Sequence, residues 1–151
     1  MRRPRPSRAA ATIRLSPRHE ALVCAVLAGL VLSGAVWLVF HHLLAPADAL
    51  APHPAEAWSL RVHGALAMVT LLLLGGLLTQ HSLPAWRRGL NRVSGAWMAA
   101  TMLLLTVTGY LLYYAGSPAL REAASWLHWV AGLGVPLLLG LHMLKAGRWQ
   151  R

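Results

Sequence analysis

The sequence predicts an all-α membrane protein in which four transmembrane helices form a bundle. Of its 151 residues, 57% are apolar and 12% are charged, which is about half the charged share that is usual in a soluble domain. Four stretches contain no Asp, Glu, Lys or Arg, and each is longer than the about 20 residues that cross a bilayer as a helix. We therefore expect spans at about 21–44, 58–81, 93–115 and 123–144.

The first span follows a basic tail, residues 1–20, whose prolines and small residues favour disorder. Its uncharged run exceeds the apolar core of a signal peptide, which is about 7–15 residues long, so we expect a retained helix. The second span follows a proline-containing polar loop and is closed by Pro84 and the basic residues Arg87 and Arg88. Arg61, near its start, is a candidate partner of a ligand carboxylate or an interfacial anchor.

The third span follows Asn91 and Ser94, two residue types that cap helices, and its end is rich in tyrosine, as in an aromatic belt. The turn 116–118 leads into the fourth span, and a short basic tail, residues 146–151, ends the chain. Because the connections are short, consecutive helices should be antiparallel neighbours in one transmembrane domain, residues 21–145.

The placement of positive charge predicts the orientation of the bundle. Twelve of the fourteen Lys and Arg residues lie in the N-terminal tail, the loop after the second span and the C-terminal tail. By the positive-inside rule, both termini should be cytoplasmic, in a bacterial-type inner membrane. The net charge of +10 is thereby explained by topology, and no basic stripe with interleaved aromatic residues indicates a nucleic-acid partner. The lone Cys24 excludes a disulfide framework within the chain.

Two histidines dominate the fourth span. His128 and His142 are 14 residues apart, which places them on nearly the same face and about 21 Å apart along the helix axis. His63 on the second span lies at the same depth as His128, near the outer boundary. The small residues Ala67 and Gly132, one turn further along, would leave room for a flat ligand. Neutral imidazole is a common metal ligand, so His63 and His128, the outer pair, are candidate axial ligands of a haem iron. The alternative is that both only hydrogen-bond across the bundle.

His142 marks an inner level, where two partners stay open. His81 is 18 residues after His63 and faces the same way, but it lies about 27 Å from His63 along the axis, a mismatch of about 6 Å with the fourth span. His19, at the mouth of the first span, is the other candidate. Histidines spread over two levels do not suit a closed zinc site. A hydrolytic triad is not indicated, because we expect no carboxylate within a span.

Three short motifs combine His or Thr with Gly or an aromatic residue: His63-Gly64 on span two, Thr108-Gly109-Tyr110 on span three and His128-Trp129 on span four. Span four also carries Gly132-Leu133 and His142. With these motifs the chain resembles the four-helix membrane cytochrome b superfamily, which includes bacterial di-haem b-type cytochromes and the cytochrome b subunits of formate dehydrogenase and nickel–iron hydrogenase. The resemblance implies two b haems: an outer one at His63 and His128, and an inner one at His142 and His19.

The sequence therefore predicts haem-mediated electron transfer, between a quinone and a periplasmic redox partner or within a larger redox complex. Such a chain is an electron-transfer protein or a redox-complex subunit rather than a stand-alone catalyst. Two alternatives remain open: a relative of the superfamily that binds one haem or none, and a cofactor-free membrane scaffold or accessory subunit with interfacial histidines.

Overall fold

The computed structural model describes residues 15–44, 51 and 53–148, and within these ranges the chain is helical with no β-strand. Four helical segments are long and apolar enough to cross a membrane: Pro17–Leu43, Pro54–Arg87, Arg92–Tyr114 and Pro118–Lys145. The expectation of an all-α chain with four spans is thereby confirmed at the level of length and composition. The tails at residues 1–14 and 149–151 lie outside the described residues.

The first two spans each combine an α-helix with a π-helical turn. Helix α1 (Pro17–Leu38) continues into η1 (Val39–Leu43), and α2 (Pro54–Leu77) continues through η2 (Leu78–Ser82) into the short α3 (Leu83–Arg87). The third and fourth spans are α4 (Arg92–Tyr114) and α5 (Pro118–Arg148). Gly89 and Asn91, at φ angles of 72° and 47°, form the turn before α4, and both residue types tolerate this left-handed region.

Helix ends differ from the predicted boundaries because capping contacts, and not the edges of the charge-free runs, fix them. Ser16 accepts the backbone N–H of His19, so α1 begins at Pro17, inside the segment predicted as a tail. Ser117 accepts the backbone N–H of Leu120 in the same way, and α5 begins at Pro118 and continues past residue 144 to Arg148.

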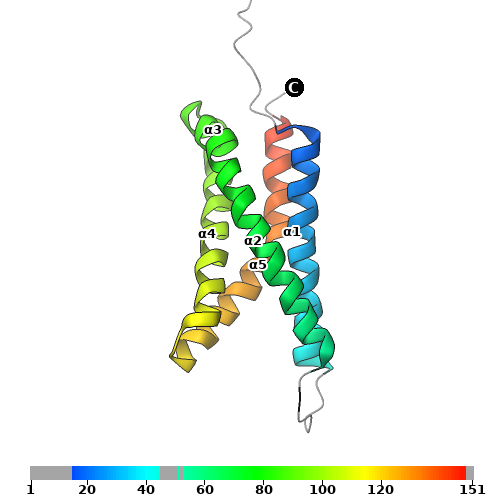
Figure 1. The fold of residues 1–151 in the computed structure, drawn as a ribbon. Helices are drawn as coiled ribbons and strands as arrows, with labels where there is room; N and C mark the ends of the chain where they lie inside the picture. Colours follow the sequence, from blue (N-terminus) through cyan, green and yellow to red (C-terminus); the bar gives the residue numbers. More distant parts are fainter. Residues whose placement is uncertain (1–14, 45–50, 52, 149–151) are drawn as a thin grey trace, which may run out of the picture.

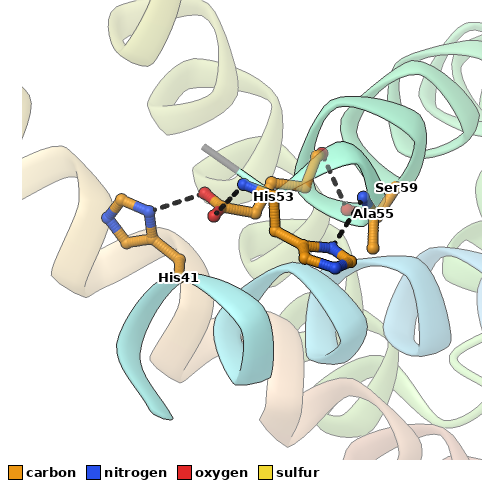
Figure 2. Close-up of polar contacts among 5 residues, drawn as sticks. His41, His53, Ala55 and Ser59 are labelled. Atoms are coloured by element: carbon orange, nitrogen blue, oxygen red, sulfur yellow. Dashed lines mark hydrogen bonds and ion pairs between the residues drawn. The ribbon is translucent and has the colours of Figure 1, made fainter. Parts of the chain in front are cut away.

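The start of α2 is fixed by a reciprocal cap, shown in Figure 2. The His53 ring accepts the backbone N–H of Ala55, and the Glu56 carboxylate accepts the backbone N–H of His53. Helix α2 therefore starts at Pro54, before the predicted residue 58. Glu56 is buried in the first turn of α2, two residues before the predicted start of the span.

The helices pack as two antiparallel hairpins. Helix α1 packs along α2 and α4 along α5, while α1 also touches α5. Helices α2 and α5 cross near the middle of the view in Figure 1, with α1 and α4 on opposite sides. The consecutive helices α2 and α4 have no comparable interface among the described residues, so only two of the three expected neighbour pairs pack closely.

Small and polar side chains make up much of the helix interfaces, beside a few apolar ones such as Val26, Met102 and Val135. Ser33, Thr70, Ser94 and Thr108 are buried, whereas Leu72 is 79% exposed. Lipid is as apolar as leucine, so helices in a bilayer gain most from close backbone approach and interhelical hydrogen bonds. Three of these buried hydroxyl groups, those of Ser33, Ser94 and Thr108, contact histidine rings.

Candidate functional site

His63 and His128 meet between the two hairpins. The His63 ring, from α2, and the His128 ring, from α5, have centroids 6.1 Å apart, with an angle of 67° between their planes. Both side chains are half-buried. The structure thus brings together the two residues that were predicted to share one depth.

The His63 ring is held by α1. Its Nδ1 lies 3.0 Å from the carbonyl oxygen of Leu30 and 3.0 Å from the Ser33 hydroxyl oxygen. A carbonyl oxygen only accepts, and the Ser33 hydroxyl donates to the carbonyl of Gly29 at 2.8 Å, so Nδ1 must carry the proton. The lone pair of Nε2 is therefore available to a ligand, since a neutral imidazole has one donor and one acceptor nitrogen.

The His128 ring is held by α4 in the same manner. Its Nδ1 lies 2.9 Å from the Thr108 hydroxyl oxygen. That hydroxyl donates to the carbonyl of Leu104 at 2.7 Å, so it accepts from His128. Nε2 is again the unprotonated nitrogen, and in the described part of the chain it makes no hydrogen bond on either ring.

A glycine follows each supporting hydroxyl and makes room for the ring. A Cβ atom on Gly34 would lie 3.4 Å from Cε1 of His63, and one on Gly109 would lie 3.4 Å from Cε1 of His128. Each hairpin thus presents a hydroxyl–glycine pair to a histidine on its second helix. Sequence reasoning found no internal repeat, although the hydroxyl lies 30 residues before the histidine in one hairpin and 20 in the other. Gly132, predicted to leave room for a ligand, lies against Leu105 of α4.

The separation of the outer pair fits two imidazoles that bind one metal ion from opposite sides. Metal–imidazole bonds are about 2.0–2.1 Å, and a ring nitrogen lies about 1.1 Å from the ring centroid, so the two centroids should be about 6.3 Å apart. The observed separation is 6.1 Å. Among the described residues, no group of three or more His, Cys, Asp or Glu side chains converges on a metal position. Within the described ranges, the site therefore offers two imidazoles and no larger set of donors.

No protein-family model, curated protein or solved structure matches this chain. The resemblance to the cytochrome b superfamily consequently stays a prediction, and the site is interpreted from its own geometry.

At the inner level, the three predicted histidines have different surroundings. Nδ1 of His142 lies 3.1 Å from the hydroxyl oxygen of Ser94 on α4. His81 lies in η2, and its Nδ1 is a buried side-chain nitrogen without a hydrogen-bond partner among the described residues. His19 is exposed, and its Nδ1 lies 3.1 Å from the hydroxyl oxygen of Ser16, the cap of α1.

The remaining outer histidines join the end of the first span to the start of α2. His41 pairs with Glu56, with Nδ1 2.9 Å from a carboxylate oxygen, as Figure 2 shows. The His41 ring stacks on Trp37 at 4.4 Å, and His53 stacks on Phe40 at 4.5 Å. These contacts give His41 and His53 structural roles at the junction between the first span and α2.

An open cleft of about 960 Å³ lies at the end of the bundle that carries η1 and the first turns of α5, and it was not predicted from the sequence. Its walls come from the end of the first span, the end of α4 and the first turns of α5. Trp37, Trp126 and Trp129 line it together with His42 and Arg121. Because Trp129 directly follows His128, the cleft and the outer pair share the same part of α5. Arg61 is not part of this lining, and its guanidinium lies over the Trp58 ring at 5.0 Å.

Proposed function

We propose that this chain is a b-type cytochrome-like electron-transfer protein of a bacterial-type inner membrane, with His63 and His128 as the axial ligands of a haem iron. The observation that supports it best is the outer pair itself: two imidazoles 6.1 Å apart, each with Nδ1 bonded to its own hairpin and Nε2 left as an acceptor. Polar side chains within a membrane span are costly, so a matched pair favours a ligand-binding role.

The surrounding residues perform the tasks that a haem protein requires of them. Leu30 and Ser33 fix the tautomer and orientation of one ring, and Thr108 fixes those of the other. A hydrogen bond to the second ring nitrogen raises the basicity of the ligating one. When bound, haem supplies a one-electron couple whose potential depends on the axial ligands, their hydrogen bonds and burial.

The charge pattern supports a periplasmic position for the outer pair. The segments rich in Lys and Arg flank the opposite end of the bundle, so both termini are proposed to be cytoplasmic. The aromatic walls and the His42 side chain of the outer cleft suit a quinone ring, and a periplasmic redox protein is the other candidate partner. The chain acts in this proposal as a single electron carrier or as a subunit of a larger redox complex.

The test is the visible spectrum of the purified protein, produced in cells supplied with haem. We expect a Soret band and a reduced-minus-oxidised α-band of low-spin b type. His63→Ala and His128→Ala should each abolish that signal at the outer site. His53→Asn is the matched control, because Asn keeps a helix-capping side chain while removing an imidazole.

A colourless wild-type protein would refute the haem proposal and favour the cofactor-free scaffold. An unchanged low-spin spectrum and haem content in both alanine variants would show that the pair is wrong even if haem is bound.

A further inference from the structure

The outer cleft lies where the two hairpins meet at one end of the bundle. One wall comes from the end of the first span and the other from the first turns of α5, together with Leu112 of α4. Both walls are terminal turns of membrane-spanning segments, Pro17–Leu43 and Pro118–Lys145. Tryptophan is enriched at this level, where spans leave the hydrocarbon and meet the polar headgroups of the lipids. The cleft is therefore placed to receive the polar end of an amphiphile.

Two adjacent stripes of α5 side chains line the cleft. Residues three or four apart lie on the same face of a helix. Arg121 and Ser125 form one stripe, and Glu122, Trp126 and Trp129 form the other, and all of them belong to the lining. The cleft thus presents a guanidinium and a hydroxyl group beside a stripe that combines a carboxylate with two indole rings.

The first stripe suits an anion. Nη2 of Arg121 donates to the carbonyl oxygen of Ala115, at the end of α4, over 2.8 Å. A guanidinium has several N–H donors in a fixed plane, so this contact orients the group and leaves other donors for a ligand. Such donors match the oxygens of a phosphate group in a bidentate manner. His42 lines the same cleft from η1 and adds an imidazole donor.

The second stripe suits a cation. Glu122 makes no hydrogen bond or ion pair within the described ranges. The Trp126 and Trp129 rings lie beside it on α5, with centroids 4.7 Å apart, and Trp37 adds a third indole from α1. The face of an indole attracts an ammonium group within about 6 Å of the ring centroid. A carboxylate without a partner, placed among indole rings, therefore favours a positively charged group.

We infer that the outer cleft binds a zwitterionic phospholipid, with its phosphate on Arg121 and its ammonium group between Glu122 and the tryptophans. Arg121 and Glu122 are consecutive, so their Cα atoms are about 3.8 Å apart. The phosphate and the ammonium group of such a headgroup are likewise close, because only an ethylene bridge joins them. This inference goes beyond the proposed function and requires no haem.

The apolar part of the lining favours a lipid over a free phosphate ester. Leu38, Val39 and Leu43 from the first span and Leu112 from α4 line the cleft together with the charged residues. A lipid that holds its headgroup against α5 can lay its acyl chains along these side chains. The bound lipid would then contact both hairpins.

A quinone is the alternative occupant of the cleft. Its ring would use the aromatic walls and His42, as proposed above. An oxidised quinone ring carries only acceptor oxygens, however, so it offers no donor or positive charge to the Glu122 carboxylate. A zwitterionic headgroup uses both the guanidinium and the carboxylate, and this charge complementarity favours the lipid.

The test is native mass spectrometry of the full-length protein in detergent, titrated with phosphatidylethanolamine or with phosphatidylglycerol of the same acyl chains. Both lipids carry a phosphate, but only the first carries an ammonium group. We expect the wild type to retain about one phosphatidylethanolamine per chain and to prefer it about tenfold over phosphatidylglycerol.

The variants separate the two charges. Glu122→Gln should abolish the preference, because it removes the countercharge of the ammonium group. Arg121→Gln should weaken both lipids about tenfold, since both lose a charge-assisted hydrogen bond to the phosphate. Arg61→Gln is the matched control and should change neither affinity, because the Arg61 guanidinium lies over Trp58 and is not part of the cleft lining.

Three results would overturn the inference. Equal retention of the two lipids by the wild type would indicate non-selective annular lipid, and an unchanged preference in Glu122→Gln would remove the ammonium site. Displacement of the lipid by a short-chain quinone at equal concentration would assign the cleft to the quinone. Glu122 has no partner to lose among the described residues, so a lost preference in that variant is not a sign of misfolding. His63 and His128 do not line the cleft, so the haem proposal stands or fails separately, by its own spectrum.

Discussion

Thr108→Val tests how the outer site depends on its supporting hydroxyl. The substitution keeps the side-chain shape but removes the acceptor that lies 2.9 Å from Nδ1 of His128. Thr108 is only 3% exposed, so water does not readily replace it. Leaving a buried donor unsatisfied costs about 1–3 kcal/mol, and each 1.4 kcal/mol is tenfold in affinity. Loss of such a supporting contact typically weakens metal affinity 10–100-fold, about the same magnitude.

The assay is haem titration of the apoprotein, followed by the Soret band. We expect Thr108→Val to bind haem about 10–100-fold more weakly and Thr108→Ser to recover most of the affinity. Thr106→Val is the matched control, because the Thr106 hydroxyl also bonds back along α4, to the carbonyl of Met102 at 2.8 Å, but contacts no histidine. An affinity of Thr108→Val within about twofold of the wild type, or equal weakening by Thr106→Val, would refute the assigned role.

Two other predictions concern the glycine beside the ring and the orientation of the chain. Gly109→Ala should lower haem content or shift the visible spectrum, because the new Cβ atom would lie 3.4 Å from Cε1 of His128. Gly134→Ala is the control and should change neither, because no atom lies within 4 Å of its Cβ position. Equal spectra of the two variants would contradict the packing argument. A reporter enzyme fused after Ser117 should be active in the periplasm, and one fused after Arg88 in the cytoplasm. The reverse pattern would invert the orientation and place the outer pair on the cytoplasmic side.

The sequence predicts the spans and the contact between His63 and His128, because both follow from the constant rise and rotation per residue of a straight α-helix. The length of a charge-free run gives the length of the membrane-crossing segment. The number of residues between a side chain and the nearest loop gives its depth, and residues on two helices can be in contact only at similar depth. These rules use only spacing, so they apply before any contact is known.

What spacing does not predict are features that arise from contacts and irregular turns. The start of α2 depends on a contact between His53 and Glu56, a pair that a charge count places in a loop. The support of His63 by Ser33 joins residues 30 apart, and no single segment displays it. At the inner level, η2 changes the rise around His81, so arithmetic for a straight α-helix does not give the depth of this residue.

The division into two hairpins has a consequence for assembly. Each imidazole of the outer pair is oriented within its own hairpin, His63 by α1 and His128 by α4, and the hairpins share far less backbone contact than each has internally. Each half is thus preorganised before the halves meet, and a ligand held by both rings acts as a cross-link between them. Its binding free energy adds to the cohesion of the bundle, since whatever binds only the assembled state stabilises that state.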